Sequence, residues 1–587
     1  MSSLLPADST DWTSLLNRTR ELLKTDESSS LDLARTNFSQ TRDVLQAYSN
    51  LLLLAGDNGT KKELSKDYKK KLIWDTRAAL RVALSSTSIQ DENLRNQVLN
   101  SAVLELTWHE PILQILSSQK GDSKCRVLAS QLLSNLVTAH RDAAHVITSH
   151  VALSPSNEQV TDRIRQGLTT TTTEPEKKTK GENEPPNWMD MLLACAQTNN
   201  REAMAGVVAA LHNSVVSLRK RPRDDDNAKW LDERLALDRL LMSTLCRQLV
   251  PVGQIKALIH DNTQNNDDKD AHDTGGLGDS ATEWITLLLT KCCKLGHFSK
   301  LFSSLAGQNK LPADIAIFPE HMVLLQCIHS ELDAPGSKEI VLGGEAGVEE
   351  VIATHVFLSE LCGSLRKNLP VATATDSADS TMNHHALVTI LEILAASLGQ
   401  DNDMISSTRS KLGESCCTLL SDAGIQLGAL VDSISYRNEG RKSRDFVIQQ
   451  HEQRVMTALV QLIGNVCFRC HRNQERLRLT KVPPLKQRIN AGSSSAEEEE
   501  ERNALHVLLS CTSLAHSCFT LREWAVIAIR NVLDNNEHNQ AEVAKLEANK
   551  PVQSAELASL GIRVDMDTKG NVSVVPNNKD GGNQNDA

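Results

Sequence analysis

The chain uses one helix-turn-helix phrase twice near its C-terminus, and this repetition constrains its fold more than any other feature. One copy reads Leu462-Ile-Gly-Asn-Val466 and is followed, eight residues after its Asn, by Asn473-Gln474. The other reads Ala528-Ile-Arg-Asn-Val532 and is followed at the same distance by Asn539-Gln540. Because a repeated helical unit buries its apolar face on a neighbouring unit, the phrase predicts a helical-repeat solenoid.

Weaker copies of the phrase occur upstream. Leu132-Leu-Ser-Asn135-Leu136 resembles the C-terminal copies, although Ala143-Ala144 stands where their Asn-Gln pair would be. A fainter copy spans Ala209 to Val216 and contains Asn213. The irregular distances between the copies predict a divergent array of repeats with long insertions.

Composition favours an all-α fold. Aromatic residues make up only 3% of the 587 residues, and the alternating β-branched and aromatic runs typical of strands are almost missing. A chain of this length is too long for one compact core, whereas a solenoid grows in one dimension. We therefore predict an all-α, armadillo-like helical-repeat solenoid with long disordered insertions.

Charge and cysteine content limit which partners the protein can bind and which cellular compartment it is expected to occupy. A net charge of −11 disfavours a broad phosphate-binding surface, so we expect no nucleic-acid partner. No run approaches the roughly 18 apolar residues of a membrane span, and the stretch from Met1 to Asp8 lacks the pattern of a signal peptide. Thirteen scattered cysteines indicate free thiols in a reducing compartment. These features predict a cytoplasmic protein that does not bind membranes.

Two segments carry a resemblance to a known family. They read Leu462-Ile-Gly-Asn-Val-Cys-Phe-Arg-Cys-His-Arg-Asn-Gln474 and Arg522-Glu-Trp-Ala-Val-Ile-Ala-Ile-Arg-Asn-Val532. From about Val455 to Val575 the chain resembles the C-terminal region of the ataxin-10 family of armadillo-like α-solenoid proteins. The acidic insertion from Ala491 to Glu501 departs from the family pattern. The resemblance implies a cytoplasmic, non-catalytic scaffold with protein partners and links to cytokinesis and cell survival.

Polar, low-complexity segments divide the helical stretches. The segment 154–187 contains five consecutive threonines, and its composition predicts disorder. The predicted organisation, in chain order, is armadillo-like repeats at 10–153, a disordered linker at 154–187, central helical repeats with loop insertions at 188–454, an ataxin-10-like armadillo domain at 455–563 and a tail at 564–587.

Three asparagines are candidates for partner binding. Asn135, Asn465 and Asn531 occupy matching points of the repeated phrase. In peptide-binding armadillo proteins such asparagines line a concave groove, where an amide offers both a donor and an acceptor to the backbone of an extended segment. The alternative is that each side chain ties neighbouring turns together within the repeat.

Three further residues complete the predicted partner-binding set. Trp524 lies seven residues before Asn531 on the same helix face, where core packing is the alternative. Arg530 and Arg522 flank that face and could meet an acidic partner, with a solvated charge on a helix as the alternative. Arg530 and Arg469 belong to the predicted set.

The chain offers no clear site for chemistry. Cys467-Phe-Arg-Cys470 lacks the second ligand pair that a zinc site needs, so its cysteines are predicted to pack as small apolar side chains. A phosphate loop, a nucleophile elbow, a His-Glu-x-x-His helix and a dinucleotide fingerprint are all missing. We predict that the chain is not an enzyme and binds neither a cofactor nor a metal.

Other binding functions stay open at this point. A nuclear transport adaptor of the armadillo type is one, although such adaptors place a Trp four residues before each groove Asn, and the chain has Gln131, Gln461 and Ile527 there. A chaperone-like regulator that holds client proteins is another. Self-association is a third, because exposed apolar ends of solenoids associate.

Overall fold

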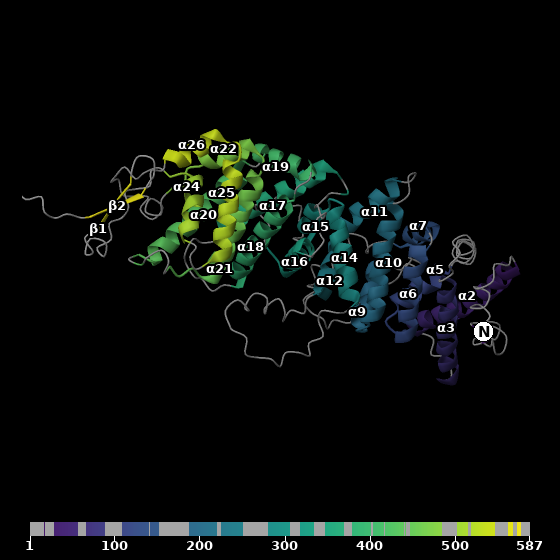
Figure 1. Cartoon of the computed structure of the whole chain (residues 1–587). Helices are drawn as coiled ribbons and strands as arrows, with labels where there is room; N and C mark the ends of the chain where they lie inside the picture. Colours follow the sequence, from purple (N-terminus) through teal and green to yellow (C-terminus); the bar gives the residue numbers. More distant parts are fainter. Residues whose placement is uncertain are drawn as a thin grey trace, which may run out of the picture. The chain divides into compact units, whose positions relative to one another are not determined.

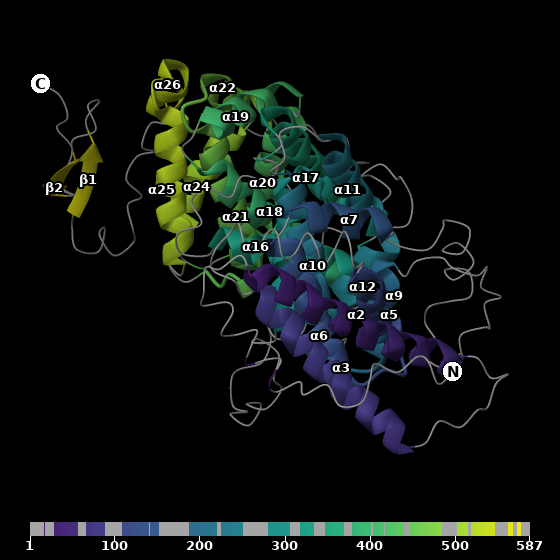
Figure 2. The same ribbon diagram turned by 90° about the vertical axis from the view of Figure 1, so that its right-hand side faces the viewer.

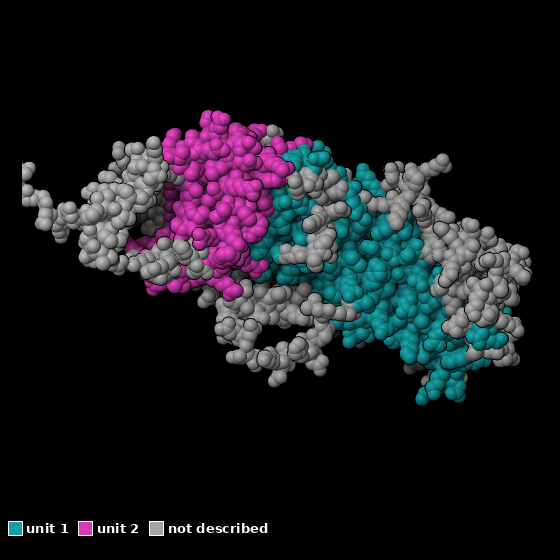
Figure 3. Space-filling model, in the orientation of Figure 1, with its two compact units in different colours: residues 1–408 teal, residues 409–587 magenta. Residues whose placement is uncertain are grey.

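Helices dominate the computed structural model of the chain (Figure 1). They cluster into two compact units, residues 1–408 and residues 409–587 (Figure 3). The structure describes residues 14, 17, 29–56, 66–87, 108–139, 141–151, 187–219, 225–249, 280–305, 317–333, 345, 347–368, 378–400, 403–415, 417–439, 441, 446–483, 502–514, 518–545, 562–566 and 572–576.

Unit 1 is a stack of helix pairs. Its helices are α2 (Ser29–Gly56), α3 (Lys66–Thr87), α5 (His109–Ser117), α6 (Ser123–Ala139), α7 (Arg141–His150), α9 (Trp188–Gln197), α10 (Arg201–Arg219), α11 (Asp225–Leu237), α12 (Arg239–Leu249), α14 (Ser280–Lys294), α15 (Phe298–Leu305), α16 (Pro319–Asp333), α17 (Val348–Asn368) and α18 (Ala378–Leu398). The next helix, α19 (Asp403–Ser415), contains the boundary between the units.

The pairs of unit 1 form two rows, which we call the first row and the second row. In the first row α3, α6, α10, α14, α16 and α18 pack successively on one another. In the second row α2, α5, α9, α12, α15 and α17 do the same. Of these, α2, α5, α9 and α17 each pack on one helix of the first row, and α12 and α15 each pack on both α14 and α16. Figure 1 shows this succession from α3 to α18, and in Figure 2 the first helices of the stack, α2 and α3, face the viewer. Contacts that run only between neighbouring pairs are the defining property of a solenoid.

Glycines allow close approach of packed helices in both units. A Cβ atom built at Gly206 in α10 would lie 2.8 Å from the backbone carbon of Ser130 in α6. One at Gly464 would lie 3.0 Å from the Cα of Ala528. Both glycines therefore stand where two helix backbones approach too closely for a side chain.

Unit 2 repeats the two-row arrangement. Here α21 (Gln450–Cys467) packs on α25 (Phe519–Leu533), and α20 (Cys417–Arg437) packs on α24 (Ala504–Leu514). The short helices α22 (His471–Leu479) and α26 (Glu537–Lys545) contact each other, and each also contacts the long helix that precedes it. The sequence of short, long and long helices is that of an armadillo repeat.

The predicted fold class is confirmed, with one departure. Strands β1 (Ile562–Met566) and β2 (Val572–Pro576) form an antiparallel hairpin near the C-terminus, where the sequence predicts the last residues of the armadillo domain and the tail. The Val-Ser-Val alternation at 572–574 is the strand signal in this segment.

The predicted domain limits stay a prediction, and two observations lie near them. Helices α6 and α10 lie on either side of the predicted linker 154–187 and pack directly on each other, so one stack includes both. The second compact unit starts at Arg409, upstream of the predicted domain start at 455. The predicted insertions lie mostly outside the described residues, as does the tail after 576.

Two buried histidines make the stability of unit 1 depend on pH. The Nδ1 atom of His321 accepts the N–H of Phe318 at 3.0 Å, so its Nε2 donates to the Phe302 carbonyl at 2.9 Å. In His355, Nδ1 lies 2.7 Å from the Val351 carbonyl. Burial lowers the pKa of both side chains from 6.5 to about 4, because a buried imidazolium loses its hydration.

We expect unit 1 to lose stability on acidification. Between pH 6.5 and pH 4 the unfolded chain binds protons that the folded chain excludes, so stability is complete above pH 6.5 and falls as the pH falls. At pH 5 each of His321 and His355 should cost about 2 kcal/mol. Thermal melts from pH 7 to pH 5 should therefore show a smaller loss for His355→Gln than for the unmodified chain.

The control for this experiment is His538→Gln, because His538 is an exposed side chain of unit 2. It should leave the pH dependence of the melting temperature of unit 1 unchanged. An equal pH dependence in His355→Gln and in the unmodified chain would contradict the expectation.

Candidate interaction surface

The Asn-Gln pairs of the repeated phrase cap helices. Asn473, near the start of α22, is 1% exposed. Its Nδ2 donates to the carbonyl of Val466 at 2.9 Å, in the last turn of α21, and to the carbonyl of Arg409 at 3.0 Å. The last carbonyls of a helix have no partner within it, so this side chain satisfies one of them.

The neighbouring Gln474 joins two repeats. Its Nε2 donates to the carbonyls of Cys467 at 3.3 Å, Asn531 at 2.8 Å and Asp534 at 3.2 Å. Its Oε1 accepts from the amide of Asn536 at 3.2 Å. One buried glutamine thus caps α21 and the following repeat's α25 together.

The second copy of the phrase repeats the first cap. Asn539 donates to the carbonyls of Val532 at 3.0 Å and Gln474 at 3.1 Å. Gln540 donates to the carbonyl of Leu533 at 2.8 Å but is exposed, since no further repeat in the described part covers it. The spacing of eight residues is therefore the distance that lets a short helix cap the long helix before it.

Two of the three candidate groove asparagines share one contact. The amides of Asn135 and Asn531 donate to the preceding helix of their row, and the fainter copy at Asn213 does the same. The pairs are Asn135 with the hydroxyl of Thr87 at 3.0 Å, Asn213 with the hydroxyl of Thr138 at 2.6 Å and Asn531 with the carbonyl of Gly464 at 3.1 Å. The carbonyl of Asn465 accepts from the Arg409 guanidinium at 3.5 Å. These contacts join neighbouring repeats, whereas the alternative interpretation placed them within one repeat. Partner binding by the asparagines stays a prediction.

The other three predicted contact residues differ in how exposed their side chains are. Trp524 is half-buried on α25, and Arg530 is exposed on the same helix. Arg469 is exposed in the turn before α22, with a positive φ of 51° and its guanidinium 4.8 Å from the centre of the Phe468 ring. The Arg409 guanidinium lies 5.1 Å from the same ring. Two cations thus gather at one aromatic side chain.

The last long helix, α25, has an open apolar stripe that the sequence analysis did not single out. Phe519 is 71% exposed, Val526 55% and Ile527 43%. Glu523 and Arg530 are exposed between and beside them. Phe519, Glu523, Val526 and Arg530 follow one another at helical spacing, so they share one face. We call these four residues, with Ile527, the end stripe.

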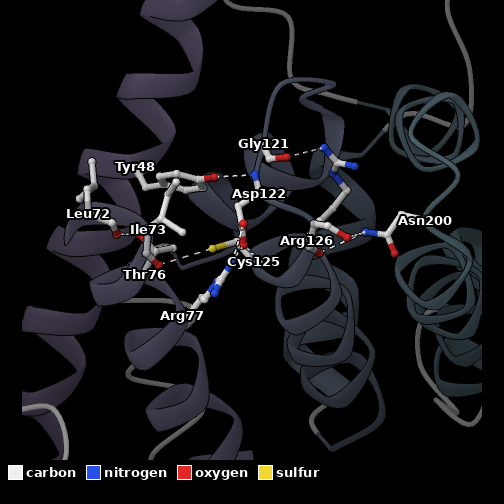
Figure 4. Close-up of polar contacts among 11 residues, drawn as sticks. Tyr48, Leu72, Ile73, Thr76, Arg77, Gly121, Asp122, Cys125, Arg126 and Asn200 are labelled. Atoms are coloured by element: carbon white, nitrogen blue, oxygen red, sulfur yellow. Dashed lines mark hydrogen bonds and ion pairs between the residues drawn. The ribbon is translucent and has the colours of Figure 1, made fainter. Parts of the chain in front are cut away.

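A polar cluster joins α2, α3 and α6 in unit 1 (Figure 4). Arg77 donates to both carboxylate oxygens of Asp122, at 2.9 and 2.6 Å. The backbone N–H of Asp122 donates to the hydroxyl of Tyr48 at 2.7 Å, and its carboxylate caps α6 through the N–H of Cys125 at 2.9 Å. Burial raises the pKa of Asp122, but Arg77 and the Cys125 N–H outweigh it and hold the pKa below its usual value.

Arg126, one residue further along α6, is a buried cation. It is 1% exposed, and its Nη2 donates to the carbonyls of Ser118 at 2.9 Å, Gln119 at 3.4 Å and Gly121 at 3.1 Å. Its Nη1 donates to the hydroxyl of Thr198, just after α9. The side chain therefore fixes the α5–α6 turn to the next helix pair.

Metal-binding side chains do not cluster in the described residues. No group of three or more His, Cys, Asp and Glu side chains in this part of the chain could hold a metal ion. Cys467 of the Cys-x-x-Cys pair is buried, and burial raises the pKa of its thiol. Among the described helices, none is long and apolar enough to cross a membrane.

Comparison with known proteins agrees with the C-terminal geometry. Residues 492–575 match the family described as the spinocerebellar ataxia type 10 protein domain. The chain is 27% identical to Ataxin-10 of Xenopus tropicalis over 107 residues, which are 18% of this chain and 18% of that protein. The resemblance of the C-terminal part of the chain to the ataxin-10 family is confirmed. The matched domain lies within the stretch 455–575 that carries the resemblance, and it contains α24, α25, α26 and almost all of the hairpin.

Solved structures add little to this resemblance. A circular tandem repeat protein with novel repeat topology covers 92% of this chain and 98% of its own, at 10% identity and a TM-score of 0.25. A crystal structure of SYS-1 covers 93% and 90%, with the same identity and TM-score. At these TM-scores the likeness carries no further argument.

Proposed function

We propose that this chain is a cytoplasmic, non-catalytic scaffold of the ataxin-10 type that binds extended segments or helices of other proteins. The resemblance to the ataxin-10 family and the helical-repeat fold support a scaffold in general. The links to cytokinesis and cell survival come from the family resemblance alone. The observation that carries the proposal is the row of helices whose asparagines recur at matching positions.

The asparagines retain hydrogen-bonding capacity toward a partner. A side-chain amide has two N–H donors and one carbonyl acceptor. The bond from Asn135 to Thr87 and the bond from Asn531 to Gly464 each engage one N–H and fix the plane of the amide. An amide held in this way can pair with the backbone of an extended segment without losing further side-chain freedom.

A double variant tests the asparagines of unit 2. We expect Asn465→Ala combined with Asn531→Ala to lower the yield of proteins captured from a cytosolic extract about tenfold, because two hydrogen bonds to a partner are worth about 1.5 kcal/mol together. Captured proteins would be quantified by mass spectrometry, with far-ultraviolet circular dichroism as the check that helicity is intact.

A matched control separates lost binding from lost stability. Ser510 and Ser513 are exposed on α24, and each donates to a carbonyl of its own helix, at 2.9 Å in both cases. The Ser510→Ala and Ser513→Ala double variant should capture as much protein as the unmodified chain. Unchanged capture in the asparagine variant would move the binding surface away from these residues.

The competing functions give different results in the same experiment. A nuclear transport adaptor would capture proteins with basic import signals, and a chaperone-like regulator would gain stability with its client present. Self-association would appear as a change of mass with chain concentration. Arg469, Arg530 and Trp524 remain predicted contacts, and their single alanine variants can be measured beside the asparagine variant.

A further inference from the structure

The short helix α22 and the turn before it have a basic surface that the next repeat lacks. From Arg469 to Lys481 the chain has four arginines and one lysine against a single glutamate. The matching segment of the next repeat, 535–547, has one lysine against three glutamates. Both segments keep the Asn-Gln pair that caps the preceding long helix. The repeat therefore forms without these positive charges, and the fold does not explain them.

The turn before α22 places an arginine where the backbone favours asparagine or glycine. The Cys470 N–H donates to the Cys467 carbonyl at 3.2 Å. Between them, Phe468 has φ −58° and ψ 117°, and Arg469 has φ 51°, as in a type II turn. The matching turn of the next repeat has Asn535 at this position, with φ 52°. Because arginine tolerates a positive φ less well than asparagine, its presence here points to a role of its side chain.

Exposed cations share one face of this segment with one apolar residue. Arg469, Arg472 and Arg476 are exposed, and Leu479 is 63% exposed. Steps of four and three residues place Arg472, Arg476 and Leu479 on the same face of α22. The Arg469 guanidinium lies 4.8 Å from the centre of the Phe468 ring, which holds it by a cation–π contact. We call Arg469, Arg472, Arg476 and Leu479 the basic face.

The nearby carboxylates have partners outside the basic face. Glu475 forms an ion pair with Arg478 of the same helix. On the neighbouring α26, Glu542 lies 3.4 Å from Nε2 of His506 and 3.7 Å from Nζ of Lys545. Both carboxylates are thereby shared with side chains that do not belong to the basic face. Its exposed guanidinium groups are left to attract acidic groups from solution.

We propose that the basic face binds a short acidic segment of a partner protein, with carboxylates on the arginines and an apolar side chain on Leu479. A guanidinium pairs with a carboxylate through two parallel hydrogen bonds, and lysine cannot do the same. The face rises about 10 Å from Arg472 to Leu479. Together with Arg469 it matches about five residues of an extended segment.

A peptide fits this surface better than a nucleic acid does. Leu479 offers an apolar contact at the end of the face, which a row of phosphates cannot use. The net charge of −11 on the chain also repels a polyanion that extends beyond the basic face. The inference rests on the proposed scaffold function, because it names the chemistry of one bound segment, but it places that segment on α22 and not on the row of asparagines.

Fluorescence anisotropy with the full chain tests the basic face. The probe is a labelled peptide, Leu-Glu-Glu-Glu-Glu-Leu, and the comparison probes are Leu-Gln-Gln-Gln-Gln-Leu and a short oligouridylate. We expect the glutamate peptide alone to bind. Its affinity should fall when the salt rises from about 0.1 M to about 1 M, because the Debye length falls from about 10 Å to about 3 Å. Equal binding of the two peptides, tighter binding of the oligouridylate or no binding would overturn the proposal.

The next repeat supplies the substitutions that remove the basic face. Arg469→Asn and Arg476→Glu introduce the residue types that stand at the matching positions, 535 and 542. The double variant should bind the glutamate peptide about tenfold more weakly. Its melting temperature should stay near that of the unmodified chain, because asparagine fits the positive φ at position 469 and both side chains are exposed.

A control of equal charge separates the basic face from the net charge of the chain. Arg441→Asn combined with Lys300→Glu changes the charge by the same amount at two exposed positions. Arg441 precedes α21, whose length of about 27 Å separates it from the turn at Arg469, and Lys300 lies on α15 in unit 1. The control should bind the glutamate peptide as the unmodified chain does. An equal loss in both double variants would contradict the proposal.

The same probe distinguishes this inference from the proposed function. The chain with Asn465→Ala and Asn531→Ala should still bind the glutamate peptide, because its basic face is unchanged. Capture of proteins by the unmodified chain together with no binding of the glutamate peptide would overturn the acidic segment and leave the scaffold function standing.

Discussion

Replacing Arg126 by Met should destabilise unit 1 by about 4 kcal/mol, the largest effect we expect from any single substitution. The guanidinium is the hydrogen-bond donor for three carbonyls of the α5–α6 turn and for the Thr198 hydroxyl. Methionine fills a similar volume but donates nothing, so these oxygens lose their partner in a buried site. Hydrogen exchange should show the loss in α5, α6 and α9, with a lower melting temperature for unit 1.

Arg77→Met is the matched control for Arg126. Its guanidinium also meets oxygen acceptors, but the side chains of Arg77 and Asp122 are 31% and 18% exposed. Water can replace part of the hydrogen bonding that Asp122 loses, and the Asp122 carboxylate still accepts the N–H of Cys125. We expect a cost of about 1 kcal/mol. Equal costs for the two substitutions would show that the buried turn does not depend on Arg126.

Replacing Gln474 by Ala should lower the free energy of unfolding of unit 2 by about 3 kcal/mol. The substitution removes the donor to three carbonyls and the acceptor for Asn536, and it leaves a cavity between two repeats. Chemical denaturation followed by hydrogen exchange of α21 and α25 measures the change. Because Gln474 joins both helices, both should exchange faster.

Gln540 is the control that the sequence itself provides. It occupies the same place in the second copy of the phrase, but it is exposed and donates to a single carbonyl, that of Leu533. Gln540→Ala should cost about 0.5 kcal/mol. Equal losses of stability in Gln474→Ala and Gln540→Ala would contradict this account, because they would show that the bonds of Gln474 to a second repeat do not stabilise unit 2.

Local signals made the helical repeats predictable. The spacing of apolar residues marked the long helices, and the repeated Asn-Gln pair marked the turn and the short helix after α21 and α25. The role of the pair could not be read from one copy, because its acceptors include the carbonyl of Arg409, 64 residues away in the chain. Contacts of that range depend on how the repeats stack.

The candidate site was predictable only in part. Matching positions identified Asn135, Asn465 and Asn531, but sequence spacing alone could not show that Asn135 and Asn531 already donate to the preceding helix. The exposure of Phe519 and Val526 was equally hidden, because an apolar residue at helical spacing is buried in most repeats and open only in the last one. The hairpin escaped an all-α prediction because five-residue strands give a weak periodic signal.

The most direct test of the scaffold is hydrogen exchange of the full chain with and without the protein that it captures in highest yield. Binding along the groove predicts slower exchange in α21 and α25, centred on the turns that contain Asn465 and Asn531, and little change in α20 and α24. Slower exchange confined to α20 and α24, or to segments outside the helices, would contradict binding along the row of asparagines.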